Sequence, residues 1–413
     1  MDNLSHSIIG LAVGELVQRS LARERDPAAQ RQRRRLLLVA GLVASNFPDL
    51  DLLLTPLLAQ PLGYLMHHRG HTHTLVWLLP QLLLLWAAIW LWPSARSLLR
   101  TSMSARIGLV VVSVLGMLLH LGMDFLNSYG LHPFHPLDSR WFYGDAIFIV
   151  EPVFWVLFAL PLVMSVQRTR VRALALMTVL VLPIWLAGNG FLAWAAVVLL
   201  ELAAIAVARV SWRDGSTHRR GLLLAFGLCL AFIAVQTLAS RQARLQVVTA
   251  FESGTHPERV VDAAMTPFPT HPFCWVFVTV ESGAENYRIR RGMLSLWPGV
   301  FPLSSCPARL VERSQMGAPS VAGSWRADTI SVSFDREFSI AALRSYRTQS
   351  CHFDAWLRFV RVPSLDERAA SDERYGPLGR ANFTSFVRGD FDGTPCPEGV
   401  PQWAYPRADL LGM

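Results

Sequence analysis

Charged residues are scarce in this sequence. Only 16% of its 413 residues are Asp, Glu, Lys or Arg, whereas a typical soluble domain has about 25%. The deficit lies between Leu36 and Ser240, and charges return at ordinary density after Arg241. Long uncharged runs are rare in soluble cores. We therefore interpret residues 1–240 as a membrane domain and residues 241–413 as a water-soluble domain.

Lysine is absent, so arginine supplies all of the basic charge behind the formal net charge of +8. An excess of positive charge can indicate nucleic-acid binding. These arginines, however, gather between apolar segments, as in the cytoplasmic loops of membrane proteins. We expect membrane lipids as partners and no nucleic acid. The expected cytoplasmic clusters are Arg96/Arg100/Arg106, Arg168/Arg170/Arg172, Arg209/Arg213/Arg219/Arg220 and the run from Arg19 to Arg35.

Several apolar segments have the length needed to cross a bilayer, roughly 20 residues. No cleavable signal is expected, because the N-terminus lacks a basic region and a small-residue cleavage site. Placing the arginine clusters in the cytoplasm predicts an all-α polytopic membrane domain of about seven to eight membrane segments. Residues 241–413 are then expected on the periplasmic side of a bacterial inner membrane. The segments are 4–20, 36–48, 52–66 (near the outer surface or dipping in), 74–95, 107–126, 146–167, 173–208 (a hairpin turning at Gly188–Gly190) and 221–240.

The sequence has only five cysteines. Cys229 lies in an apolar segment, and the other four cysteines lie in the region that is expected on the periplasmic side. None of these four belongs to a CxxC motif, which argues against a zinc site. An even number in an oxidising compartment indicates two disulfides, although three pairings and the alternative of unpaired thiols remain open. The four are Cys274, Cys306, Cys351 and Cys396.

The C-terminal domain shows strand patterns and no catalytic motif. We expect a small α+β or β-rich fold that covers the outer face or gates the substrate. Residues 266–280 indicate a turn and then a strand, residues 286–292, 329–334 and 355–363 indicate further strands, and residues 335–346 indicate a short helix.

The few ionisable residues of the membrane domain gather at the expected outer ends of its segments. The stretch HHRGHTHTL, residues 67–75, precedes an uncharged run, while His120 and Asp124 lie one helical turn apart on one face. Ionisable groups in an apolar segment are costly unless partnered, which favours a functional site. Imidazole and carboxylate together suit zinc or another divalent metal. For His120 and Asp124 alone, a hydrogen-bonded structural pair is the alternative.

The histidine-rich stretch supplies two expected ligands, His68 and His73, and Gly70 allows the backbone to turn tightly between them. His67 and His71 are expected beside the ligands or facing solvent, with a direct bond to the metal as the alternative.

Arg69 cannot bind a metal, but its planar guanidinium suits a carboxylate or a phosphate oxyanion. A bridge to Asp49 or Asp51 is the alternative. Two further histidines, His132 and His135, stand in a proline-rich loop, and we interpret them as structural or gating residues.

Five short motifs in residues 1–155 resemble, in order and combination, those of a known family. They are MDNLSHSIIGLAVGEL, SNFPDLDLLL, HHRGHTHTL, HLGMDFLNSYG and DAIFIVEP. The family comprises the LexA-regulated, inner-membrane-associated metal-dependent hydrolases (YdjM-like). It is similar, more remotely, to zinc-dependent phospholipases C, which use histidines and aspartates, including an HxxxD pair, to hold a trinuclear zinc cluster. The C-terminal domain also resembles the longer family members.

The resemblance implies a ligand set, with Arg69 and Asp51 beside it. Asp51 or Glu151 would act as general base; Glu151 stands where the family often has aspartate, and its reach differs. One to three divalent ions, expected to be zinc, would activate water and clamp a phosphoryl oxygen. The implied ligands are His6, Asp49, His68, His73, His120 and Asp124.

The sequence thus predicts a membrane-bound metal-dependent hydrolase acting on a phosphoester or ester of a lipid, because a site at segment ends meets lipid headgroups. Two alternatives remain. A transporter would need ionisable residues at mid-membrane depth. A non-catalytic membrane scaffold would hold a structural metal in a closed site.

Overall fold

The computed structural model describes residues 1–214, 219–253, 258–307 and 328–413. The chain divides into two compact units. Two segments of the N-terminal half, residues 51–71 and 126–147, belong to the same unit as the C-terminal region. Unit 1 comprises Met1–Leu50, Thr72–Phe125 and Phe148–Val235, and unit 2 comprises Asp51–His71, Leu126–Ile147 and Gln236–Met413.

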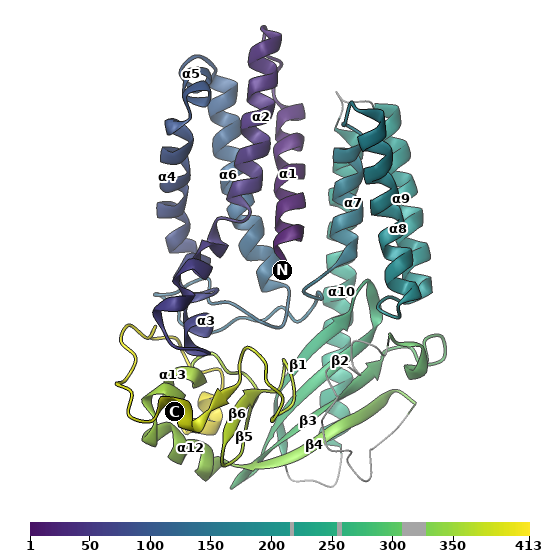
Figure 1. The fold of residues 1–413 in the computed structure, drawn as a ribbon. Coiled ribbons are helices and arrows are strands. Elements are labelled where there is room, and N and C mark those ends of the chain that lie inside the picture. Colours follow the sequence, from purple (N-terminus) through teal and green to yellow (C-terminus); the bar gives the residue numbers. More distant parts are fainter. Residues whose placement is uncertain (215–218, 254–257, 308–327) are drawn as a thin grey trace. The chain divides into compact units, whose positions relative to one another are not determined.

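Unit 1 is helical, and several of its helices lie side by side in Figure 1. Two short 3-10 helices, η1 (Pro48–Leu57) and η2 (His71–His73), adjoin it, and α10 (Arg220–Glu252) continues into unit 2. The α-helices within unit 1 are α1 (Asn3–Ser20), α2 (Pro27–Ala44), α4 (Leu75–Leu91), α5 (Pro93–Thr101), α6 (Met103–Phe125), α7 (Pro152–Val163), α8 (Thr169–Gly188) and α9 (Trp194–Asp214).

Four described helices are long and apolar enough to cross a membrane, namely α6, α8, α9 and α10. Counting each of two bent helix pairs as one span raises the number to six: α2 with η1, and Leu62–His73 with α4. The expected seven to eight segments are therefore not confirmed. One reason is α7, whose 12 residues fall short of the roughly 20 that a perpendicular span needs. The expected turn at Gly188–Gly190 does separate α8 from α9.

Helices α1 and α2 approach each other closely at Gly10 and Gly41. A Cβ atom on Gly10 would lie 2.3 Å from the carbonyl oxygen of Gly41, and one on Gly41 would lie 2.2 Å from that of Gly10. A side chain at either position would therefore collide with backbone, which is why small residues are favoured where membrane helices touch. This contact sets the spacing between α1, which carries His6, and the end of α2, which leads to Asp49.

Unit 2 contains two antiparallel sheets. The larger has the order β1-β2-β3-β4, and its core includes the cross-strand pair Trp275 and Leu294, both fully buried. The strands are β1 (Arg259–Phe268), β2 (His271–Ser282), β3 (Asn286–Ser295) and β4 (Ile330–Ser339), with β5 (Pro363–Leu365), β6 (Ala369–Asp372) and β7 (Phe386–Val387) in the smaller sheet. The helices are α3 (Leu62–His67), η3 (Leu303–Ser305), α12 (Ile340–Gln349), α13 (Cys351–Leu357), η4 (Arg388–Phe391) and α14 (Ala408–Leu411).

The expected sheet-containing C-terminal region is confirmed, with two corrections to its elements. Asp335–Ser339 continue β4, so the predicted helix begins only at Ile340. Residues 355–363 were predicted as a strand, and this is wrong for most of them, because α13 extends to Leu357 and β5 begins at Pro363. The apolar residues there recur at helical spacing, and the Ser350 hydroxyl caps α13 by accepting a hydrogen bond from the Phe353 N–H at 3.2 Å.

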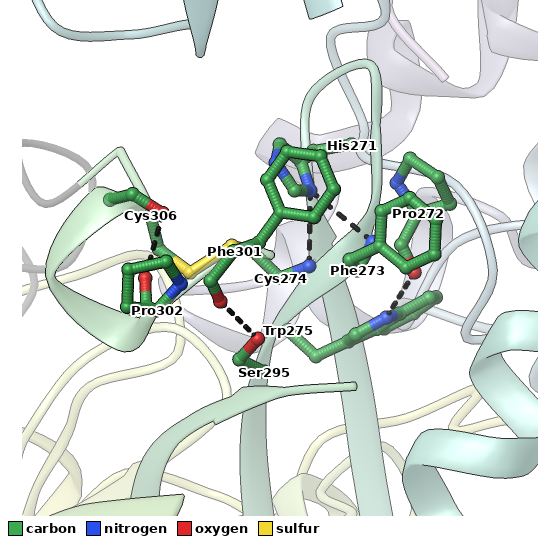
Figure 2. Close-up of a disulfide and its surroundings, with 10 residues drawn as sticks. His271, Pro272, Phe273, Cys274, Trp275, Ser295, Phe301, Pro302 and Cys306 are labelled. Atoms are coloured by element: carbon green, nitrogen blue, oxygen red, sulfur yellow. Dashed lines mark hydrogen bonds between the residues drawn. A yellow bond between two sulfur atoms is a disulfide. The ribbon is translucent and has the colours of Figure 1, made fainter. Parts of the chain in front are cut away.

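Two disulfides join the four C-terminal cysteines, as expected. They link Cys274 to Cys306 and Cys351 to Cys396, whereas Cys229 is a buried free thiol. Figure 2 shows the first bridge beside His271, whose Nδ1 accepts hydrogen bonds from the N–H groups of Phe273 at 3.2 Å and Cys274 at 3.1 Å.

The two inserted segments share a hydrophobic core with the C-terminal region. Leu65 and Met66 of α3 are fully buried in one cluster with Tyr129, Trp356 and Phe359. Unit 2 therefore cannot fold around the C-terminal region alone, because residues from all three parts of the chain supply its interior.

A buried ion-pair network also ties segment 126–147 to the C-terminal region. Both terminal nitrogens of Arg361 donate to the Asp145 carboxylate at 2.9 Å, and its Nε donates to Asp262 at 2.7 Å. The charges of Arg361, Arg407 and Arg244 lower the pKa of the Asp262 carboxyl far below its ordinary value despite its burial. Asp145, the first residue of the motif DAIFIVEP, thus has a structural partner in this unit.

Candidate metal centre

Four predicted ligands converge in unit 1. Asp49 lies at the start of η1, just after α2, and His73 ends η2 immediately before α4. His120 and Asp124 lie near the C-terminal end of α6, where their spacing of four places both side chains on one face. All four side chains are buried or nearly so, and each offers one ligand atom within 4.8 Å of the others.

The separations between these atoms match the edges of a tetrahedron around a small cation. His73 Nε2 lies 3.0 Å from His120 Nε2, 3.4 Å from Asp49 Oδ1 and 3.3 Å from Asp124 Oδ2. His120 Nε2 lies 3.5 Å from each of the same two oxygens. Ligands held at 2.0–2.1 Å from a tetrahedral zinc ion are about 3.3 Å apart. The donor set therefore fits zinc or a similar divalent ion in both chemistry and spacing.

Three of the four donor groups are oriented by a further contact. The carbonyl oxygen of Ser45 lies 2.7 Å from His120 Nδ1 and can accept its proton, which directs Nε2 toward the other ligands. Thr72 Oγ1 lies 3.0 Å from His73 Nδ1, and Asn3 Nδ2 donates to Asp49 Oδ2 at 3.1 Å. Such outer contacts are typical of metal ligands, because they set the tautomer and the ring orientation.

His6 lies at the edge of this group. Its ring stacks on that of His120 with centroids 3.9 Å apart, and its Nε2 is 3.3 Å from Asp124 Oδ1. The amino group of Met1 also contacts Asp124 Oδ1. The structure therefore brings the predicted ligand His6 beside the four but not into the tetrahedral set. Asp124 is the residue that connects it to them.

The other predicted ligand, His68, lies in unit 2 and pairs with Asp51. Its Nδ1 is 3.2 Å from Asp51 Oδ1, and the other carboxylate oxygen accepts the backbone N–H of Arg69 at 3.0 Å. Asp51 thus engages both His68 and the turn that follows it. That turn is tight because Arg69 adopts a φ of 58°, a conformation uncommon for residues other than glycine.

The side chain of Arg69 is buried. Its Nη1 donates to Asn127 Oδ1 at 3.1 Å, and its guanidinium lies 4.5 Å from the ring centre of Tyr129. Burial, with smaller contributions from Tyr64 and Tyr375, raises the pKa of the Tyr129 hydroxyl well above its ordinary value. The backbone N–H of Arg69, not its guanidinium, makes the hydrogen bond to Asp51, so a guanidinium bridge to Asp49 or Asp51 stays an alternative. The predicted role of Arg69 in binding an anionic substrate group stays a prediction.

Glu151 is fully buried at the N-terminus of α7. Its carboxylate accepts the Val153 N–H at 3.3 Å, so it acts there as a helix cap. Its predicted role as general base, like that of Asp51, stays a prediction.

Sequence reasoning missed the groups that orient the ligands. Asn3 and Thr72 lie within the quoted motifs, but no spacing rule marks them as partners of Asp49 and His73. The Ser45 contact uses a backbone carbonyl, which leaves no signal in the sequence. Arg361 was missed because its partner Asp145 is 216 residues away.

Comparisons with known proteins place the first half of the chain. Residues 1–196 match the family described as YdjM inner membrane protein. The chain is also similar to the uncharacterized protein YfhP of Bacillus subtilis (strain 168), with 25% identity over 168 residues, which cover 38% of this chain and 43% of that protein. No solved structure matches.

The matched region contains every residue of the candidate metal centre and most of the predicted membrane segments. Asp49, His73, His120 and Asp124 all lie within it. The family-level resemblance seen in the motifs is therefore confirmed, since residues 1–196 of this chain match the family described as YdjM inner membrane protein.

Proposed function

We propose that this chain is a membrane-bound metal-dependent hydrolase that cleaves a phosphoester or ester of a lipid-like substrate. The observation that carries the proposal is the spacing of 3.0–3.5 Å between buried histidine and aspartate ligand atoms. Burying carboxylates and imidazoles together is costly unless they share a cation or protons. A divalent metal held there would activate water and polarise the scissile ester or phosphoryl group.

The candidate ligands and the other predicted site residues have separate proposed tasks. Asp49, His73, His120 and Asp124 hold the cation, with Ser45 and Asn3 orienting two of them. Asp51 is the proposed general base, because its carboxylate already accepts from one N–H and lies against the His68 imidazole. Arg69 is the proposed site for the substrate's anionic group.

A lipid-like substrate is supported by the place of the ligands on their helix. His120 and Asp124 lie close to the end of α6, which runs from Met103 to Phe125. A site near the end of a membrane span meets headgroups rather than acyl chains. The same position disfavours a transporter, whose substrate site typically lies at mid-membrane depth.

A structural metal site is the second candidate, and one observation favours it. Four protein donors around one tetrahedral ion leave no position for water, as in structural zinc sites. A catalytic site would need one carboxylate to shift or to bridge a second ion. The two functions differ in whether any substrate is turned over.

Hydrolysis by the detergent-purified full chain tests the proposal. Wild type and Asp124→Asn should be compared on phospholipids, lipid phosphates and carboxylic esters, with bound metal measured in the same samples. We expect wild-type turnover of at least one class and loss of both turnover and metal in the variant. Metal-loaded wild type that cleaves no substrate class would overturn the hydrolase and leave the structural site.

The proposed orientation has its own test. We infer from the arginine clusters that the C-terminal region is periplasmic. A reporter active only outside the cytoplasm, fused after Met413, should be active, and the same reporter fused near Arg100 should be silent. The opposite pattern would overturn the orientation without affecting the metal centre.

A further inference from the structure

Three buried polar atoms of unit 2 have no hydrogen-bond partner within the part of the chain that the structure describes. They are the hydroxyl oxygens of Tyr129 and Tyr375 and the side-chain nitrogen Nδ2 of Asn127. Tyr129 and Asn127 are only 5% and 4% exposed, whereas Tyr375 is half-buried with its hydroxyl oxygen enclosed. Buried donors without a partner are uncommon and energetically costly. A bound molecule that accepts hydrogen bonds would explain all three.

The three side chains form one cluster with Arg69. The rings of Tyr129 and Tyr375 have centroids 6.0 Å apart, and the charge of Arg69 acts on both hydroxyl groups. The Arg69 guanidinium lies 4.5 Å from the Tyr129 ring centre and donates to Asn127 Oδ1 at 3.1 Å. Two phenols and an amide thus lie beside one positive charge, and this combination favours an anion.

Contacts within the cluster define which atoms can donate to a ligand. Asn127 Oδ1 accepts from Arg69 Nη1 and, at 2.9 Å, from the backbone N–H of Tyr129, so the amide presents Nδ2 as its donor. Burial raises the pKa of both phenols, so Tyr129 and Tyr375 stay protonated and can donate. The cluster takes the positive charge of Arg69 and needs no further hydrogen bond from it.

The cluster is held together by contacts between distant segments of unit 2. Arg374, which follows β6, donates to the carbonyl oxygens of Ser128 at 2.7 Å and Tyr129 at 3.3 Å. These bonds tie segment 126–147 to the part of the chain that carries Tyr375. Donors that are fixed before a ligand arrives lose little conformational freedom on binding.

The cluster lies close to the surface of unit 2. Phe383 is 39% exposed, and its ring centre lies 4.5 Å from that of Tyr375 and 6.3 Å from that of Tyr129. An exposed apolar ring beside buried hydrogen-bond donors matches a lipid-like molecule, in which an apolar chain adjoins an anionic headgroup.

The donors suit a phosphate better than a carboxylate. A phosphomonoester has a charge of about −1.5 to −2 and three acceptor oxygens, whereas a carboxylate has a single charge and two oxygens. The nearby Asp51 carboxylate, which also acts on the Tyr129 hydroxyl, opposes either anion. Its charge is partly offset, because it accepts the Arg69 backbone N–H at 3.0 Å and lies 3.2 Å from His68 Nδ1.

We propose that Asn127, Tyr129 and Tyr375, beside the charge of Arg69, bind the phosphate of the substrate. The site rests on the proposed hydrolase and narrows its substrate from an ester in general to a phosphoester. It also gives the C-terminal region a part in substrate binding, through Tyr375.

Binding of dioctanoyl phosphatidic acid to the detergent-purified full chain tests the site, with bound metal measured in every sample. Tyr129→Phe and Tyr375→Phe each remove one donor and keep the ring, so we expect each to weaken binding about tenfold at unchanged metal content. Octanoate, which offers a carboxylate on a chain of the same length, should bind wild type at least tenfold more weakly than the phosphatidic acid. Tyr346→Phe, which removes a buried hydroxyl outside the cluster, is the matched control and should keep wild-type affinity.

Thermal unfolding without ligand separates binding from packing. An unpartnered hydroxyl does not stabilise the unliganded protein, so Tyr129→Phe and Tyr375→Phe should melt at or above the wild-type temperature. Wild-type affinity for phosphatidic acid in both variants overturns the site, and equal affinity of wild type for octanoate overturns its preference for phosphate. Wild type that binds phosphatidic acid through these donors, yet cleaves no substrate class, would overturn the hydrolase alone.

Discussion

His120 Nδ1 lies 2.7 Å from the carbonyl oxygen of Ser45, so the end of α2 determines which nitrogen of His120 faces His73. The two Nε2 atoms are then 3.0 Å apart. Such an approach requires either a proton between them or a cation bound to both. This choice can be tested directly.

Substituting the histidines of the buried centre should remove bound metal. We expect His73→Ala and His120→Ala to retain less than about a tenth of the wild-type metal after dialysis against a chelator, because each loses one of four donors. Elemental analysis of purified protein measures this, with His352→Ala as control. Full metal retention in both variants would assign the 3.0 Å contact to a shared proton.

Arg69→Ala should destabilise unit 2. The change removes a buried charged hydrogen bond to Asn127 and the contact with Tyr129, which together are worth about 2–4 kcal/mol. Thermal unfolding of wild type and variant measures this loss. Turnover per folded molecule then separates packing from substrate binding. If Arg69 binds the substrate's anionic group, turnover should fall as well as stability. Unchanged turnover would leave Arg69 with packing alone.

Both disulfides should be present in solution. Under denaturing, non-reducing conditions a thiol-reactive mass label should modify Cys229 alone, because the other four cysteines are paired. Replacing Cys274 and Cys306 by serine should cost about 3–4 kcal/mol, the loop-entropy value for a separation of 32 residues. Labelling at five cysteines would contradict the pairing.

Unit 2 should lose stability in mild acid through His271. Burial lowers the pKa of this histidine to about 4 from its ordinary value of 6.5. The unfolded chain therefore binds the proton more readily, so the stabilisation is complete above pH 6.5 and is lost as the pH falls from 6.5 to about 4. The loss approaches about 3 kcal/mol.

Urea unfolding of the full chain between pH 7 and pH 4 measures this dependence, followed by a signal from unit 2. His271→Asn, which does not titrate in this range, is the control and should show a shallower loss. Equal pH dependence in wild type and variant would assign the effect to other groups. The N–H groups of Phe273 and Cys274 give the physical reason, because protonation of Nδ1 would break both hydrogen bonds (Figure 2).

The candidate centre was predicted in part from the sequence. The four-residue spacing of His120 and Asp124 is a property of any helix, and His73 and Asp49 stood in polar motifs beside apolar runs. His6 and His68 fit the same reasoning, yet the described geometry leaves His6 beside the tetrahedral set and pairs His68 with Asp51. Spacing along the chain does not determine which donors share one centre.

By itself the sequence determined the membrane character of the first half, the sheet in the second half and the chemistry of the ligands. These follow from local properties, namely hydropathy, strand pattern and residue type. Only the tertiary structure decided that Cys274 pairs with Cys306, that Arg361 binds Asp145, and that segments 51–71 and 126–147 join the core of unit 2. The reason is physical: such contacts join residues that are distant along the chain, and they form only where packing and the burial of charge bring both partners to one place.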